Sequence, residues 1–367
     1  MFLPALLLRD MGWAGYWIFA IPNVIGAALV GWSIKSRSSS SSFVENHAAA
    51  IWWFSAITLA FHFYWILWFT NFIQAAFNIP AYYLAGCIGI VCAFALILSR
   101  FSRLGKAPQI AFVLLAFSLG VLISTTSTTD LKDASTPLFN SAQQAMAPLW
   151  MFPVMLFGFL LCPYLDITFH HARQQLDSQK NGRLGFTIGF VGFFSFMILL
   201  TTRYAGVIIG AMEGSQFSSI VPLWLGAAIL IHILCQWFFT IHVHLDRMRT
   251  LSGAKRKQPM LVVLLVVSGI TGVLAPRLPA YAGLAGGEII YRLFLSAYGL
   301  IFPAYMLHRV IARRKNNTSG WQSGLWISIA LAVPLFWMGF IERQTVWLIP
   351  GMALVLCGSL IQPKKRS

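Results

Sequence analysis

The chain has 367 residues, of which 58% are hydrophobic and 10% are charged, a composition far too apolar for a water-soluble domain. Its net charge of +16 would suit a nucleic-acid-binding protein if the basic residues formed one patch. They lie instead in short loops between apolar runs, so the predicted surrounding is the lipid bilayer and no nucleic-acid partner is expected.

Apolar runs that meet or approach the roughly 20 residues needed to cross a bilayer as a helix occur along the whole chain. None alternates in the manner of a membrane barrel strand, so the predicted fold class is all-α. We expect one integral membrane domain over residues 1–367, polytopic, with about 11 transmembrane helices. The predicted spans are 12–33, 49–70, 79–100, 107–125, 145–167, 184–204, 219–243, 259–276, 283–308, 322–341 and 346–361.

Most of the 26 Lys and Arg residues fall in alternate loops, on one side of the predicted membrane. The other side holds Arg9, Lys132, Arg203, Arg277 and Arg343. The positive-inside rule then places the N-terminus outside and the C-terminus in the cytoplasm, in a multi-pass protein of the cytoplasmic (inner) membrane.

The first span contains Pro22 followed by Asn23. A proline in a membrane helix frees a backbone carbonyl, and Asn23 is a candidate both to satisfy it and to line a solute or proton pathway. Gly26, Ala27 and Gly31 form a small face that predicts close packing against another helix. A kinked packing helix is the alternative interpretation.

His62 lies deep in the aromatic-rich second span. An ionisable residue at this depth is a default site hypothesis, so His62 is a pathway candidate. The alternative is a neutral histidine that forms a hydrogen bond with a neighbouring helix.

The region from residue 148 to 183 starts as an apolar helix and becomes polar abruptly after two helix breakers, Gly158 and Pro163. Asp166, His170 and Arg173 then follow at helical spacing i, i+4, i+7, which places them on one face. Such a face could gate a pathway, relay protons or bind an anion. Equally, it could be the exit of a membrane helix, whose polar groups meet headgroups and cytosol.

Span 219–243 carries His232 and Gln236 four residues apart, and both are pathway candidates. The stretch HVHLD at its end does not predict a metal site, because residues two apart on a helix point about 200° away from each other. The five cysteines all lie within apolar spans without a CxxC pair. No metal and no cofactor is therefore predicted.

Glu288 and Arg292 lie four residues apart, near the start of span 283–308. Each would be costly alone in lipid, while together they can neutralise each other. A structural ion pair and a binding-site pair are both consistent with this spacing.

Several stretches resemble the sodium/solute symporter family, which has the five-plus-five inverted-repeat (LeuT-type, APC superfamily) fold. The segment FGFLLCPYLDITFHHARQQLDSQKNGRLGFTIGFVGFFSFMILLTTRYAG resembles the family's helix that ends in a proline, its basic cytoplasmic stretch and its small-residue return helix. FSSIVPLWLGAAIL resembles the following outer-loop proline and helix, and IPNVIGAALVGW with FVENHAAA resembles the second core helix and its cytoplasmic turn. The resemblance implies a LeuT-like bundle that transports a small solute.

The sequence departs from this family in two ways. In this register the chain begins at the second core helix, so the bundle would lack the first core helix. The Ser/Thr pair that completes the family's sodium site is replaced by Leu234, Cys235, Gln236 and Trp237. Neither sodium coupling nor any binding residue is therefore carried over from the family.

We expect a secondary transporter, or a transporter-like protein, for an unidentified small solute, with proton coupling through Asp166 and the histidines. Two alternatives remain open: a membrane-embedded enzyme that acts on a lipid or isoprenoid, and a non-transporting sensor or assembly subunit.

The arrangement of the polar residues separates these alternatives. A transporter would place along a central cavity the residues Asp166, His232, Gln236 and Glu288. An enzyme would bring together, around a lipid-accessible cleft, the residues His170, His171, His242 and His244.

Overall fold

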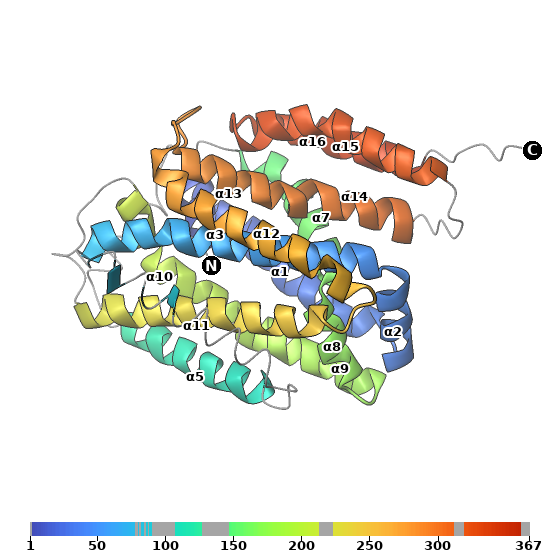
Figure 1. Cartoon of the computed structure of the whole chain (residues 1–367), viewed down its shortest axis with the longest axis horizontal. Helices are drawn as coiled ribbons and strands as arrows, with labels where there is room; N and C mark the ends of the chain where they lie inside the picture. The colour runs from blue at the N-terminus through green and yellow to red at the C-terminus, as the bar shows by residue number, and fades with distance from the viewer. Residues whose placement is uncertain are drawn as a thin grey trace, which may run out of the picture.

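The computed structural model describes residues 2–77, 107–126, 147–212, 223–311 and 319–360, with a few residues between 80 and 89. Within these ranges the chain is a bundle of helices that lie side by side along the long axis of the molecule (Figure 1). The described residues form no strand; their one β-type contact is an isolated bridge between Tyr281 and Leu284. The predicted all-α class is confirmed.

The N-terminal half contains α1 (Phe2–Ser33), α2 (Arg37–Asn46), α3 (Ala48–Phe77), α5 (Ala107–Thr126), α7 (Pro148–Leu161), η1 (Cys162–Leu165), α8 (Ile167–Gln174) and α9 (Gln179–Phe186). The chain continues through η2 (Thr187–Phe194), α10 (Ser195–Met212), α11 (Leu223–Met248), α12 (Ala254–Leu274), η3 (Ala275–Arg277) and α13 (Gly286–Ser296). It ends with η4 (Ala297–Ile301), α14 (Phe302–Tyr305), η5 (Met306–Ile311), α15 (Ser319–Phe340), η6 (Thr345–Trp347) and α16 (Leu348–Leu360).

Seven helical stretches in the described part are long and apolar enough to cross a membrane. They are Phe2–Ser33, Ala48–Asn71, Pro148–Leu165, Gln179–Gly206, Ala254–Arg277, Gly286–Ile311 and Gln322–Phe340. Two shorter apolar stretches, Gln109–Val121 and Thr345–Leu360, accompany them. The protein is thus a multi-pass helical membrane protein, while the predicted span 79–100 lies almost wholly outside the described residues.

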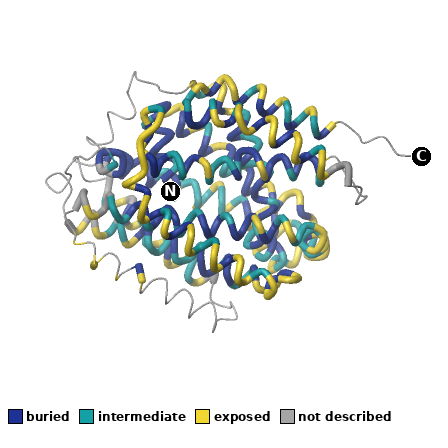
Figure 2. Tube along the Cα trace, turned by 45° about the horizontal axis from the view of Figure 1, so that its top comes forward, coloured by how far each residue is buried: buried dark blue, intermediate teal, exposed yellow. Residues whose placement is uncertain are grey.

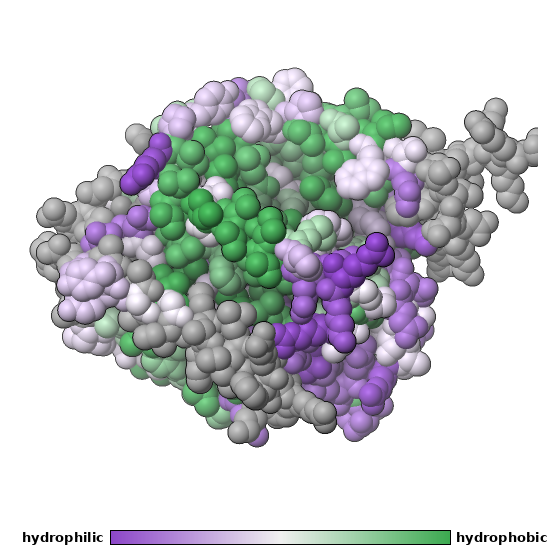
Figure 3. Space-filling view, viewed as in Figure 1, coloured by the Kyte–Doolittle hydropathy of each residue, from purple (hydrophilic) through white to green (hydrophobic). Residues whose placement is uncertain are grey.

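The surface agrees with this assignment. Figure 3 shows hydrophobic side chains across the middle of one face, where α12 exposes Val262, Val263, Val266 and Ile270. Hydrophilic side chains gather at one end of that face, the end at which α2, α8 and α9 lie in Figure 1. Buried residues run through the interior of the bundle (Figure 2), and their largest side chains include Trp52, Trp68, Trp237 and Tyr291.

Small residues allow two close helix crossings. A Cβ on Gly26 of α1 would lie 1.9 Å from the carbonyl oxygen of Phe159 in α7. A Cβ on Gly272 of α12 would lie 2.4 Å from the carbonyl oxygen of Tyr64 in α3. The backbones can approach so closely only because neither glycine has a side chain. The predicted small face of the first span therefore packs as expected.

The first helix begins at Phe2, ten residues before the predicted span 12–33, and it is broken at Gly12. Gly12 has φ 60° and ψ −151°, a backbone conformation that is essentially restricted to glycine. The carbonyl oxygen of Leu7 lies 2.3 Å from the position of a Cβ on Gly15, although eight residues of straight helix span about 12 Å. The chain therefore folds back on itself at Gly12.

We call residues 2–11 the N-terminal segment. It enters the interior of the bundle, where the ring of Phe2 lies 4.9 Å from that of Tyr291 and 5.5 Å from that of Trp68. Leu8 and Met11 are fully buried. These residues, which precede the predicted span 12–33, are therefore part of the core, between α3 and α13.

Candidate functional site

A cavity of about 360 Å³ lies among the helices, a volume typical of small-molecule sites. Its wall is mostly apolar and comes from α1, α3, α7, η1, η2, α10, α11, α13, η4 and α15, with Asp166, the residue that caps α8. Polar and charged side chains interrupt the wall at a few points, among them Asp10, His62, Asp166, Gln236 and Arg292. Most of the pathway candidates predicted from the sequence thus line one cavity.

Helix interruptions surround this cavity. Besides the break at Gly12, α7 ends at Leu161 and passes into the short 3₁₀ turn Cys162–Leu165, which contains Pro163. The π-helical turn Ala297–Ile301 lies directly between α13 and α14. Gly158 lies inside α7, where a Cβ would come to 3.0 Å of the carbonyl oxygen of Tyr298. It lines the cavity as a point of close contact, and the interruption itself lies at Pro163.

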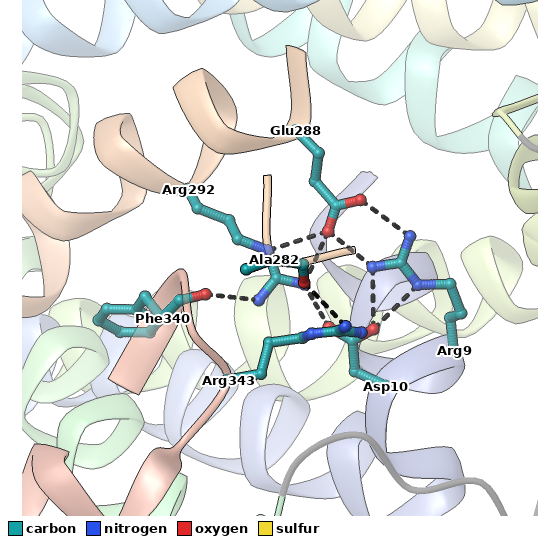
Figure 4. A network of polar contacts seen from close by, with 7 residues as sticks. All are labelled: Arg9, Asp10, Ala282, Glu288, Arg292, Phe340 and Arg343. Atoms are coloured by element: carbon teal, nitrogen blue, oxygen red, sulfur yellow. Dashed lines mark hydrogen bonds and ion pairs between the residues drawn. The ribbon is translucent and has the colours of Figure 1, made fainter. Parts of the chain in front are cut away.

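At one end of the cavity Glu288 and Arg292 belong to a larger network with Arg9 and Asp10 of the N-terminal segment (Figure 4). Arg9 donates two hydrogen bonds to the two oxygens of Glu288, at 2.9 and 2.6 Å, and a third to Asp10 at 2.9 Å. Arg292 donates to Glu288 at 2.9 and 2.7 Å, to Asp10, and to the carbonyl oxygen of Phe340 at 3.0 Å. We call these four charged residues the ion network.

The ion network contains two guanidinium groups and two carboxylates, so its charges balance. The side chains of Asp10 and Glu288 are 2% exposed and that of Arg292 is 6% exposed. Carboxylates buried to this degree are tolerated only when they are paired and hydrogen-bonded, as both are here. The spacing of Glu288 and Arg292 indicated an ion pair, whereas Arg9 and Asp10 were missed.

Asp166 lies at another part of the cavity wall. Its Oδ1 caps α8 by accepting hydrogen bonds from the backbone N–H of Thr168 at 2.8 Å and from its hydroxyl at 2.7 Å. Its Oδ2 lies 3.9 Å from Nε2 of His244, which is beyond hydrogen-bond distance. Tyr298 lies near this part of the wall, where its carbonyl accepts a hydrogen bond from Cys162. Arg292 precedes Tyr298 by six residues of helix, or about 9 Å.

His170 and Arg173 share the helix of Asp166 but do not line the cavity. His170 is fully buried; its Nε2 donates to the carbonyl of Tyr164 at 2.8 Å, which leaves Nδ1 to accept from the hydroxyl of Ser40 at 3.0 Å. Arg173 is also fully buried and donates to the carbonyls of Ile34 and Lys35, both at 2.7 Å. These contacts tie α8 to α2 and to the end of α1.

The remaining candidates divide in the same way. Asn23 and His62 line the cavity, and His62 donates from Nδ1 to the carbonyl of Thr58 at 2.6 Å. His232 is buried away from it, with Nδ1 3.1 Å from the hydroxyl of Ser118 on α5. Gln236 donates to the same hydroxyl at 3.4 Å and reaches the cavity. Of the four residues expected along a transport cavity, Asp166 and Gln236 line it. Glu288 does not, but it accepts hydrogen bonds from Arg292, which does.

Three of the four histidines expected to cluster in an enzyme have different polar neighbours. His170 binds Ser40 and Tyr164, His171 pairs with Gln175 at 2.9 Å, and His244 faces Asp166. Among the described residues no group of three or more His, Cys, Asp or Glu side chains is placed to hold a metal ion.

Comparison with known proteins adds no identity: no protein-family model, no curated protein and no solved structure matches this chain. The site must be interpreted from its own chemistry.

Proposed function

We propose that this protein is a secondary transporter, or a close derivative of one, that moves a small solute across a membrane through the central cavity. The observation that carries the proposal is the cavity itself, enclosed by many helices and bounded at one end by the ion network and elsewhere by Asp166. Transporter sites lie between helices that are broken near the middle of the membrane, because the breaks expose backbone and polar groups to the solute.

The three interruptions support this function physically. A break in a helix costs hydrogen bonds, so in a membrane it is retained where it lines a cavity or is buried in protein. Cys162 of the turn that contains Pro163 and Tyr298 of the π-helical turn line the cavity, and Asp10, which also lines it, lies two residues before the break at Gly12. Such points can absorb the backbone rotations that open a cavity alternately to two sides.

Finer features belong to the same proposal. They are eleven transmembrane helices in a LeuT-type arrangement, distant kinship with the sodium/solute symporter family, and proton rather than sodium coupling. Location in the cytoplasmic membrane with the basic loops inside follows from the loop charges. No observation in the described residues favours an enzyme or an assembly subunit over transport.

Uptake into proteoliposomes tests the function. Wild-type protein and Asp166→Asn are reconstituted and assayed with radiolabelled amines, amino acids, sugars and monocarboxylates under an imposed pH gradient. We expect saturable uptake of one class by the wild type. In the variant we expect uptake to fall by about tenfold or more, as for loss of a charged hydrogen-bonding group. Failure of every class to enter above protein-free vesicles, from a protein that stays folded, would remove the proposal.

A further inference from the structure

The charges that line the cavity are not all balanced. Asp10 and Arg292 both reach it, but their charges are matched inside the ion network. Asp166 also lines it, and among the described residues it has no ion pair with Lys or Arg; its one ion-pair neighbour is His244, at 3.9 Å. The carboxylate of Asp166 is therefore the unbalanced charge of the described cavity wall, and its sign is negative.

One oxygen of this carboxylate is left for a ligand. Oδ1 is occupied by the two hydrogen bonds from Thr168, whereas Oδ2 accepts none within the described part of the chain. The titratable groups that face Asp166 are His244 from α11, His170 on its own helix and Tyr298 from η4. The side chain of Asp166 is 15% exposed, so Oδ2 is open to the cavity, where a cation could bind it.

Aromatic rings form a continuous part of the cavity wall. Phe54 and Phe61 of α3, Tyr291 of α13 and Tyr298 all line it, and we call these four residues the aromatic wall. Their ring centroids lie 5.5 Å apart for Phe54 and Tyr298, 5.1 Å for Phe61 and Tyr291, and 6.4 Å for Phe61 and Tyr298. Aromatic faces attract cations, most strongly where water is excluded. An apolar group would also pack well against them.

We propose that the cavity binds an organic ammonium ion, with its charged nitrogen at Oδ2 of Asp166 and its apolar body against the aromatic wall. This names the substrate class of the transport proposed above and rests on it. One carboxylate cannot hold a proton and an ammonium ion at once, so the two compete. Proton coupling at this residue then takes the form of exchange of the cation for a proton.

Binding to the purified full-length protein in detergent, measured by calorimetry near neutral pH, tests the inference with three probes of one shape. These are benzylammonium, which is cationic, benzyl alcohol, which is neutral, and benzoate, which is anionic. We expect benzylammonium to bind at least about tenfold more tightly than the other two, because only it can pair with the carboxylate. Equal binding of all three, no binding of any, or a preference for benzoate would overturn the proposal.

Two sets of variants separate the ligand contacts from the fold. Asp166→Asn removes the charge but retains a side chain that caps a helix equally well, so α8 should remain intact. We expect it to weaken benzylammonium binding by roughly tenfold to a hundredfold. Tyr298→Phe keeps the ring and should retain binding, whereas Tyr298→Leu should weaken it by about threefold to thirtyfold. Unchanged binding by Asp166→Asn would contradict the assigned site.

The binding assay does not require transport, so the two proposals can fail independently. Selective binding of benzylammonium without uptake of any solute class into proteoliposomes would support the proposed cation site and contradict the proposed transport. Uptake of an anionic or neutral solute, without selective cation binding, would support the proposed transport and contradict the proposed substrate class.

Discussion

Arg292 connects more of the site than any single residue recognised from the sequence. It contacts Glu288 on its own helix, Asp10 on the N-terminal segment and the backbone of Phe340 on α15. Spacing along the chain indicated only the first of these contacts, because four residues of helix bring Glu288 and Arg292 together whatever else surrounds them. The contacts with Asp10 and Phe340 depend on how distant helices pack, which spacing does not encode.

Replacing Arg292 with Met should destabilise the protein by about 3–5 kcal/mol, because it leaves two buried carboxylates with Arg9 as their one remaining partner in the network. Unfolding of the purified protein in mixed micelles measures the loss. Arg343→Gln is the matched control, since Arg343 donates to the carbonyl of Ala282 outside the ion network and should cost no more than about 1.5 kcal/mol.

A paired replacement checks the reason for this loss. Arg292→Met combined with Glu288→Met leaves Arg9 with Asp10, an arrangement that again has no net charge. If unpaired charge is the cause, the paired variant should recover much of the stability lost by the single variant. A paired variant as unstable as Arg292→Met alone would assign the loss to packing.

At the scale of elements, the sequence located most helices well, since apolar runs of membrane length are an unambiguous signal. The predicted 49–70 and 107–125 correspond to α3 (Ala48–Phe77) and α5 (Ala107–Thr126). The predicted first span, 12–33, did not include the N-terminal segment, and Arg9 was assigned to the outer side of the membrane. The partners of Arg9 and Asp10 lie 279 and 282 residues further along the chain, beyond the reach of any local pattern.

The residues after Pro163 show the same limit. Periodicity correctly put His170 and Arg173 on one short helix, which Asp166 caps, but did not show what that helix faces. Arg173 donates hydrogen bonds to the backbone carbonyls of Ile34 and Lys35. His170 accepts one from the hydroxyl of Ser40. Every residue has a backbone carbonyl, so the sequence does not show which carbonyls accept these hydrogen bonds. A buried structural residue and a site residue therefore look alike until the neighbouring helix is placed.

The crossing of α1 and α7 predicts the effect of a single methyl group. Gly26→Ala would bring Cβ to 1.9 Å of the carbonyl oxygen of Phe159, so the two backbones would have to separate. We expect a loss of about 1–3 kcal/mol in unfolding free energy. Gly189→Ala is the control, because no atom lies within 4 Å of its added Cβ, and its stability should stay within about 0.5 kcal/mol of the wild type. Equal effects of the two substitutions would contradict the close crossing.

At the scale of the whole molecule, the end that carries α2, α8 and α9 contains histidines as well as basic residues (Figure 1). Burial, with the charges of Arg309 and His170, lowers the pKa of His47 from 6.5 to about 4. Burial and the charge of Arg247 lower the pKa of His171 to about 4 as well. Both imidazoles are therefore neutral in the folded protein at pH values where the unfolded chain is already protonated.

The sign of the pH dependence follows from these shifts. Because the folded pKa values are depressed, the unfolded state binds more protons as acid is added. Stability should be complete above about pH 6.5 and should fall progressively as the pH drops towards 4. Thermal unfolding in detergent across this range should show a smaller decline for the double variant His47→Gln, His171→Gln. An identical decline in the two proteins would exclude these histidines as its source.

The contacts of the N-terminal segment also have a consequence for biosynthesis. Arg9 and Asp10 leave the ribosome long before Glu288 and Arg292, which follow 279 and 282 residues later. During most of translation the segment can pair Arg9 only with Asp10, so it is poorly suited to remain in lipid without its later partners. Its final insertion between α3 and α13 must therefore follow synthesis of α13. A segment that is made before most of the bundle is thus among the last parts of the chain to reach its native position.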